Sequence, residues 1–238
     1  MPASPVSRVT APADALTKGE RTKLRLLEAA EEIFGRDGYH AASIADLTRE
    51  AEVAMGTFYV YFTSKQECLI ELVNARGHEL RTELREATQG LASRAEIERA
   101  GFATFLAWVR RHPDIYRVVR NAEFVDREVF RQWYRKLGQS YVRGLRQSMD
   151  AGNIDHADPE ALAYCLMAVA DFTGMRWVLW EDGAQVPKRV FDTVMQFVLR
   201  GLGAEPADGD CAKGNGRSNG ARLQQRERAS GNGAQRRR

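Results

Sequence analysis

The distribution of proline constrains the fold of this chain more than any other feature. Three prolines fall within the first twelve residues and the next is Pro113, so a hundred consecutive residues contain none. That stretch is rich in Ala, Leu, Glu and Arg, which are strong helix formers. No Asn-Gly or Asp-Gly pair lies between two alternating strand patterns. We therefore predict an all-α fold.

Helix N-terminal signals recur along the chain and predict where the helices begin. A Ser, Thr or Asp at the N-cap followed by an acidic or amide side chain satisfies the free N–H groups of the first turn. These signals are Thr17-x-x-Glu20, Ser43-x-x-Asp46, either Thr63-x-x-Gln66 or Ser64-x-x-Glu67, and Asp158-Pro159-Glu160. We expect the first helix to stop at Gly35 and Gly38, an apolar helix to run from Pro159 to about Glu181, and a last helix to follow Pro187.

Composition favours a cytoplasmic protein without a metal centre. The longest apolar run covers ten residues, 161–170, which is too short to span a bilayer, and the N-terminus has no continuous apolar segment of a secretory signal. The three cysteines and four histidines are scattered without metal-ligand spacing. We expect no metal, no cofactor and no membrane association.

The positive charge of the chain is concentrated at its C-terminal end. Residues 204–238 hold eight basic and four acidic side chains, whereas residues 18–203 are nearly balanced, with 26 basic and 27 acidic. From residue 204 the chain is mainly Gly, Asn, Ser, Arg and Gln, a composition typical of disorder. We predict a disordered basic tail over 204–238, which either adds weak salt-sensitive affinity for DNA or only improves solubility.

The stretch AMGTFYVYFTSK, residues 54–65, is the most distinctive segment. On a helix, Phe58 and Phe62 lie on one side, whereas Gly56, Thr57, Val60 and Tyr61 share the opposite arc and Tyr59 lies on the flank. A helix of two turns with half of its aromatic residues facing outward is not stable alone. With the helix from Ile44 to Ala51 before it, the segment has a helix-turn-helix outline.

A helix-turn-helix reads DNA with the N-terminal end of its second helix in the major groove. Gly56 then allows close approach to the sugar-phosphate chain, Thr57 donates to a phosphate or meets a thymine methyl group, and the Tyr59 and Tyr61 hydroxyls reach phosphates. Lys65, at the start of the next helix, also favours a phosphate. The alternative is a short amphipathic helix whose tyrosines pack on another domain.

The segment closely resembles the TetR/AcrR family of bacterial repressors. The resemblance is carried by Gly56-Thr57-Phe58-Tyr59-x-Tyr61-Phe62-x-Ser64-Lys65, preceded by Phe34-x-x-x-Gly38-Tyr39 and Ile44-x-x-Leu47, and covers about residues 18–70. It implies a dimeric transcriptional repressor that a ligand releases from a double-stranded operator. It also implies DNA contacts, mostly to phosphates, by Ser43, Gly56, Thr57, Tyr59, Tyr61 and Lys65, with Met55 near base edges.

The turn of the motif departs from the family pattern. The family commonly has Gly-Val-Ser where this chain has Glu52-Val53-Ala54. Ala54 removes a helix cap worth about 1 kcal/mol and a phosphate donor. Glu52 places a negative charge near the groove.

The C-terminal half carries more large aromatic side chains than a tight helical bundle needs, so a cavity lined by some of them suits an apolar ligand. For each single residue, a place in the core is the simpler reading. The candidates are Phe102, Phe105, Trp108, Tyr116, Phe124, Trp133, Tyr134 and Tyr141. In relatives the effector lies among these helices.

The resemblance also implies that the last two helices, 159–181 and 188–202, form a four-helix bundle with those of a second copy. Asp171 and Arg176 interrupt the apolar helix and are predicted to pair across that interface, or to meet a charged ligand group, with Phe191 and Met195 beside them. The segment Gly174-Met175-Arg176-Trp177-Val178-Leu179-Trp180 is similar to segments in regulators of fatty-acid or acyl-CoA metabolism. A fatty acyl-CoA is therefore the candidate effector.

The predicted organisation has four parts: a flexible arm over 1–16 that includes Arg8, the helix-turn-helix domain over 17–65, a ligand-binding and dimerisation domain over 66–203, and the tail. Two alternatives stay open. One is a helix-turn-helix protein that activates transcription or needs no ligand. The other is a helical enzyme, which we do not favour because the sequence has no nucleophile elbow, phosphate loop or paired acid and base.

Overall fold

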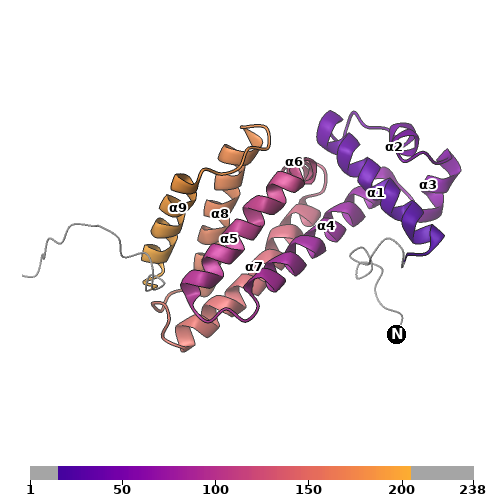
Figure 1. Cartoon of the computed structure of the whole chain (residues 1–238). Helices are drawn as coiled ribbons and strands as arrows, with labels where there is room; N and C mark the ends of the chain where they lie inside the picture. The colour runs from indigo at the N-terminus through magenta and orange to yellow at the C-terminus, as the bar shows by residue number, and fades with distance from the viewer. Residues whose placement is uncertain (1–15, 205–238) are drawn as a thin grey trace, which may run out of the picture. The chain divides into compact units, whose positions relative to one another are not determined.

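The computed structural model describes residues 16–204, and every regular element among them is helical (Figure 1). The all-α prediction is confirmed for this part of the chain. The elements are α1 (Lys18–Asp37), α2 (Ile44–Glu50), α3 (Met55–Tyr61), α4 (Lys65–Thr88), α5 (Arg94–Arg111), α6 (Pro113–Ala122), α7 (Arg127–Asp150), α8 (Pro159–Gly174), a π-helical turn η3 (Met175–Leu179) and α9 (Lys188–Gly201).

The predicted caps begin the predicted helices. The Thr17 hydroxyl accepts from the Glu20 N–H and the Glu20 carboxylate accepts from the Thr17 N–H, and Ser43 and Asp46 form the same reciprocal pair at α2. Of the two candidates for α4, Ser64 is the cap. The α1 helix continues through Gly35 and ends before Gly38, where φ is 83°, so the expected stop at Gly35 is wrong.

Gly35 has a packing role instead. A Cβ at this position would lie 2.8 Å from Cγ of Asp114 on α6, and closer still to its Cβ. The glycine therefore permits α1 and α6, which are packed together, to approach closely.

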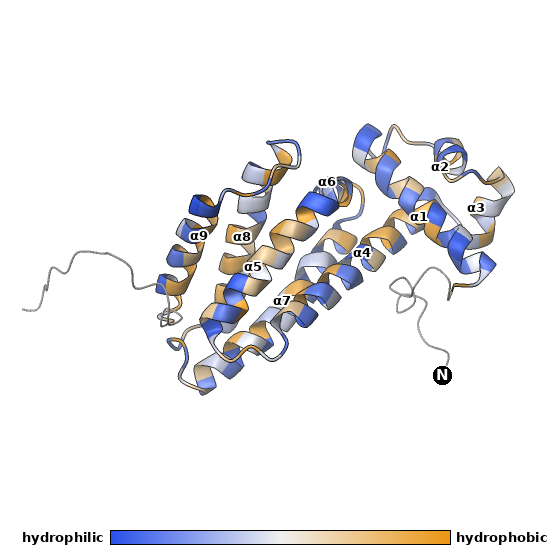
Figure 2. Ribbon diagram, in the orientation of Figure 1, coloured by the Kyte–Doolittle hydropathy of each residue, from blue (hydrophilic) through white to orange (hydrophobic). Residues whose placement is uncertain are grey.

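One continuous hydrophobic core joins the helix-turn-helix to the helices that follow it. Phe58 and Phe62 are buried with Leu26 and Leu47, as the helical spacing predicts. The same cluster continues along α4 and through α5, α6 and α7 to Val178. Figure 2 shows the matching pattern, with hydrophobic residues along the inward faces of these helices. The α4 helix packs against α1, α5, α6 and α7, and so connects the two ends of this core.

The apolar helix predicted to run from Pro159 to about Glu181 continues without a gap to Leu179, and only its last five residues change from α-helical to π-helical geometry. The α8 helix ends at Gly174, and the next five residues form the π-helical turn. Gly174 is buried against Phe105, Leu106 and Val109 of α5, about 3.6 Å from a would-be Cβ. Extra residues in a helical turn shift the side chains that follow to a different face.

Together, α8 and η3 are apolar on most of their surface. By length and composition, Pro159–Leu179 qualifies as a membrane-spanning helix, although core helices of soluble proteins pass the same test, and one such helix is weak evidence. Only 33% of its most apolar window is buried. Figure 2 shows the hydrophobic colouring along α8. A large apolar surface is therefore left uncovered on this helix.

Residues 16–204 belong to a single compact unit, so the proposed division at residue 65 falls inside it. The proposed arm over 1–15 with Arg8, the tail from residue 205 and Cys211 lie outside the described residues.

Candidate DNA-binding face and effector-binding core

One side of the α3 helix is buried in the core and the opposite side is exposed to solvent. Phe58 and Phe62 lie 5.3 Å apart between ring centroids and are buried in the core, which fixes the helix against α1 and α2. On the opposite side Tyr59 is 56% and Val60 75% exposed, and Met55 at the tip is half exposed. The sequence prediction that the aromatics divide between two faces is confirmed.

The polar groups on this face have no partners within the described chain. The hydroxyls of Thr57, Tyr59 and Tyr61 make no hydrogen bond with any residue of 16–204, and the Tyr61 oxygen lies close to Gly19 at the start of α1. A Cβ at Gly56 would meet nothing within 4 Å. Three free hydroxyls beside an open glycine suit contacts with phosphates at close approach.

Lys65 and Ser43 are engaged in holding the motif together. The Lys65 ammonium donates to the carbonyls of Tyr39 (2.7 Å) and Ala42 (2.6 Å) and lies 4.4 Å from the centre of the Tyr39 ring. The Ser43 hydroxyl is used in the cap of α2. In this structure both predicted DNA contacts stabilise the turn between α1 and α2.

The turn between α2 and α3 has a backbone conformation that favours the glycine common in the family, although this chain has Glu52 there. Glu52 follows the C-terminus of α2 and has φ of 52°, in the left-handed region that favours glycine. The N–H of Val53 closes the turn on the carbonyl of Thr48. Ala54 begins α3 without a side-chain cap, as the sequence predicts.

The eight predicted pocket residues do not form one site. Trp108, Tyr116 and Trp133 are in the main core, with Phe105 and Tyr134 packed against it. Phe102 is buried outside this cluster, and Tyr141 donates to the buried Glu98, which also pairs with Arg94. Phe124 is 81% exposed in the turn after α6. The prediction for Phe124 is wrong because no helix covers that turn.

The aromatic core contains one unsatisfied donor. Two pockets of the described region are a polar cleft of about 510 Å³ beside α1, α4 and α6 and a groove of about 290 Å³ between α7 and α8, and neither is lined by any of the eight aromatics. Within residues 16–204, the Trp108 indole N–H is the single buried side-chain polar group without a partner. Such groups are uncommon in native interiors.

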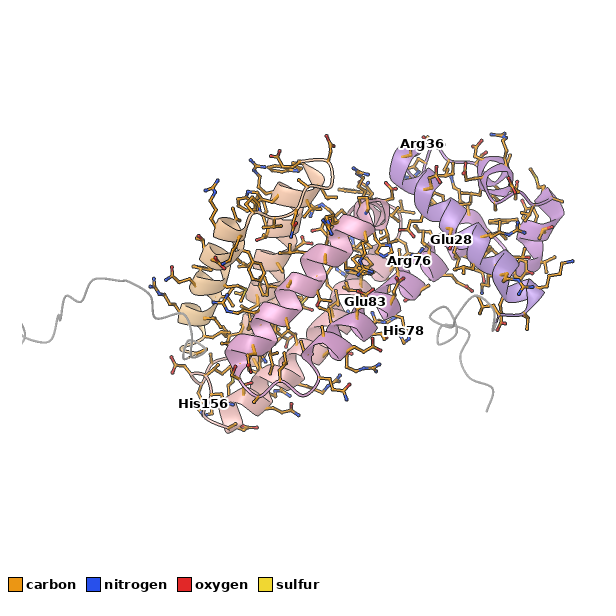
Figure 3. All side chains as sticks on the ribbon, viewed as in Figure 1. Glu28, Arg36, Arg76, His78, Glu83 and His156 are labelled. Atoms are coloured by element: carbon orange, nitrogen blue, oxygen red, sulfur yellow. The ribbon has the colours of Figure 1, made fainter. Side chains whose placement is uncertain are left out.

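The polar cleft borders an ion network that the sequence interpretation missed. Arg76 on α4 donates to Glu31 of α1 at 2.6 Å and to Glu79 at 2.8 Å. His112, between α5 and α6, lies 3.7 Å from Glu31 and 3.6 Å from Glu79. Figure 3 labels Arg76 on α4, with Glu28 and Arg36 on α1. The network ties the first helix to the helices that carry the core.

The contacts of Glu31 within this network keep its carboxylate charged despite its burial. Burial alone raises the pKa of Glu31, but the contacts with His112 and the charge of Arg76 outweigh it, so the pKa lies below its usual value. One feature of the sequence could have indicated that Glu31 is buried. Glu31 follows Leu27 by one helical turn and so falls on the buried stripe of α1.

The two charged residues predicted at the dimer interface, Asp171 and Arg176, have partners within their own chain. The Asp171 carboxylate accepts from the Tyr116 hydroxyl and pairs with Arg120 at 3.2 Å, and burial raises its pKa. Arg176 pairs with Glu181 at 2.6 Å. Both charges therefore have partners in their own chain, which removes the reason for an Asp171–Arg176 pair across an interface.

Met195 is fully buried, so its prediction as an interface residue is wrong: it faces the core of its own chain. Phe191 on the same helix is half-buried. Between the start of α8 and the end of α9, the exposed large apolar residues are Tyr164, Phe172, Trp180 and Phe197. This set, rather than the charged pair, makes up the uncovered apolar face.

Comparison with known proteins agrees with this geometry. Residues 26–72 match the family of bacterial regulatory proteins described as the tetR family. The matched stretch begins in α1 and ends in α4, and it includes the whole helix-turn-helix.

Solved structures of transcriptional regulators share the fold over most of the described chain. The regulator FadR from Bacillus subtilis, in complex with stearoyl-CoA, has a TM-score of 0.68 at 19% identity, covering 75% of this chain and 98% of that one. The fatty acid degradation regulator FadR from Bacillus halodurans has a TM-score of 0.70 at 18% identity, covering 80% and 100%. The ketosteroid regulator KstR2 of Mycobacterium tuberculosis has a TM-score of 0.59 at 18% identity, covering 80% and 98%.

At these identities the solved structures show the fold alone. The matched helix-turn-helix and that fold are both those of regulatory DNA-binding proteins rather than of enzymes. The matched region, residues 26–72, is that of the tetR family of bacterial regulatory proteins.

Proposed function

We propose that this protein is a dimeric repressor that binds a pseudo-palindromic operator through α3 and is released by a largely apolar effector, with a fatty acyl-CoA as the candidate. The observation that carries the DNA-binding half is on α3, where the hydroxyls of Thr57, Tyr59 and Tyr61 have no partner in residues 16–204 and a Cβ on Gly56 would meet open space. Such a protein acts in the cytoplasm, where the DNA is.

The apolar face on α8, η3 and α9 supports the dimer. Its four large residues are exposed, the ring centroids of Phe172 and Trp180 lie 6.2 Å apart, and exposed apolar residues of this kind mark association surfaces. A second copy offers the same face, so a two-fold interface buries it on both chains.

The effector half is supported by the aromatic core around Trp108 and by the fold shared with a regulator solved with stearoyl-CoA. Because Trp108, Tyr116 and Trp133 are buried, an effector that reaches them has to separate the helices that cover them. A ligand that binds better to the separated state shifts the population away from the DNA-binding arrangement. A ligand-independent regulator or an activator is the alternative.

The test uses DNA that the wild-type protein selects from a random pool. Tyr59→Phe, which removes one exposed hydroxyl, is expected to weaken binding several-fold while helicity and sedimentation stay unchanged. Tyr134→Phe makes the same chemical change on α7, away from α3, and is the matched control. Equal affinity of wild type and Tyr59→Phe at physiological salt would refute the placement of α3 in the groove.

Stearoyl-CoA added to the complex tests the second half. Release of the DNA supports the ligand-responsive repressor. Binding that stearoyl-CoA leaves unchanged refutes that effector and favours the ligand-independent alternative. A single protomer on a half-site would refute the dimer.

A further inference from the structure

A pair of unneutralised cations lies where α4 packs on α7. Arg81 of α4 is half-buried, and its guanidinium makes no hydrogen bond or ion pair with any residue of the described chain. One of its nitrogens lies 3.0 Å from a would-be Cβ of Gly77, and the Trp133 ring of α7 lies 3.1 Å from the same point. The guanidinium is therefore placed beside the edge of the aromatic core.

The second cation is Lys136, one turn after Trp133 on α7. Its ammonium donates to the side-chain oxygen of Asn74 at 2.8 Å, which is a neutral partner. Burial lowers the pKa of Lys136, and the nearby charge of Arg81 lowers it further; burial also lowers the pKa of Arg81. The positive charges of Arg81 and Lys136 therefore lie near each other, and both are partly shielded from water.

The carboxylates of α4 do not neutralise this pair. Three of them bind other cations: Glu71 pairs with Lys23, Glu79 with Arg76, and Glu83 with Arg111. Half-buried charges without counter-charges are unfavourable in an otherwise apolar interface. Perturbed, unpaired groups of this kind are typical of sites that a ligand completes.

We propose that Arg81 and Lys136 form the anion-binding part of the effector site, which receives a carboxylate or phosphate of an amphipathic ligand whose apolar part enters beside Trp133. This inference rests on the proposed ligand-responsive function and specifies the chemistry of the ligand. The Trp108 ring centroid is 6.0 Å from that of Trp133, so the ligand next reaches the unsatisfied indole N–H. An acceptor oxygen of the ligand satisfies that donor.

The position of the pair on α4 connects the ligand to the DNA-binding face. The same helix starts at Lys65, which holds the turn between α1 and α2, and Gln66 bonds Asp126 just before α7 at 3.0 Å. An anion between Arg81 and Lys136 changes the force between α4 and α7. Because α4 also packs on α1, its displacement moves the DNA-reading helices.

The first experiment follows the fluorescence of the four tryptophans while full-length protein is titrated with stearoyl-CoA, stearate and octadecanol below their aggregation limits. Arg81→Gln and Lys136→Gln are compared with Arg85→Gln, an exposed arginine one turn further along α4. Hydrogen bonds to a charged group are worth enough that losing one weakens binding about tenfold or more. We expect that loss for both anionic ligands with the first two variants, and no change for octadecanol or for Arg85→Gln.

The second experiment needs no ligand. Because Arg81→Gln removes an unpaired half-buried charge, the melting temperature of the free protein is expected to rise by about 2 °C or more. A structural arginine behaves in the opposite way, so a fall in melting temperature overturns the proposal.

The two readouts separate this inference from the proposed function. If neither anion binds the wild type, or if both bind the Arg81 and Lys136 variants as tightly as the wild type, the anion site is overturned. If anions bind in an Arg81-dependent way but DNA stays bound, the anion site stands and the ligand-released repressor is refuted. If stearoyl-CoA releases DNA equally from wild type and Arg81→Gln, the repressor stands and the anion site is overturned.

Discussion

Replacing Glu52 by glycine is expected to stabilise the protein, because Glu52 has φ of 52° in the turn between α2 and α3. A non-glycine residue in the left-handed region costs about 1–2 kcal/mol. Glycine loses more backbone entropy on folding, which offsets about 0.5–1 kcal/mol of the gain. The net expectation for Glu52→Gly is a free energy of unfolding higher by about 0.5–1 kcal/mol.

The same substitution removes a negative charge next to the predicted DNA-binding helix. At a separation of about 8 Å in water, one charge pair is worth about 0.5 kcal/mol, which corresponds to about a twofold gain in DNA affinity at low salt. Glu52→Gln separates the two effects, since it removes the charge and keeps the left-handed backbone with a Cβ.

Urea unfolding measures the stability, and fluorescence anisotropy with selected DNA at two salt concentrations measures the affinity. Both variants should bind DNA more tightly, and only Glu52→Gly should unfold at a higher urea concentration. If Glu52→Gly is no more stable than Glu52→Gln, the argument from backbone strain is wrong.

Two further predictions concern the first helix. Gly35→Ala places a Cβ against Asp114 and should lower the free energy of unfolding, measured by urea titration, by about 1–3 kcal/mol. In the control Gly56→Ala the Cβ meets open space, so the free energy of unfolding should rise by about 0.5–1 kcal/mol. Similar values for the two variants would contradict the close approach of α1 and α6. Glu31→Gln leaves Arg76 without its buried partner and should cost about 1–3 kcal/mol near pH 7. Because the pKa of Glu31 is lowered in the folded state, its contribution is present above the ordinary carboxyl pKa and lost as pH falls through the lowered value. The difference between wild type and variant should therefore shrink as pH falls below the ordinary carboxyl range, and a difference that stays constant there would count against the ion pair.

Local sequence signals predicted the helical fold well, since caps and helical spacing depend on residues within one turn of each other. Thr17, Ser43 and Asp158 begin helices as expected. The π-helical turn after Gly174 was not among the predictions, because local capping and spacing signals do not distinguish an α-helical from a π-helical turn.

The same limit applies to the candidate sites. Spacing separated the buried Phe58 from the exposed Tyr59 because α3 packs on the helices next to it in sequence. It did not separate Met195 from the interface or Phe124 from the core, because helices distant in sequence decide which faces are covered. The role proposed for Arg81 could not be predicted for the same reason, because a sequence shows the charge of a residue but not whether a partner lies beside it in the fold.

The continuous core has a consequence for how the protein can be divided. Phe58 and Phe62 are buried in the same cluster as Leu69 and Leu72 of α4, which lie beyond the boundary proposed at residue 65. A fragment that stops there leaves the buried side of α3 open to water, so we expect it not to fold. We then expect the helix-turn-helix and the helices that follow it to unfold together in a single transition, so a substitution deep in α5 or α7 would weaken DNA binding simply by lowering the fraction of folded protein.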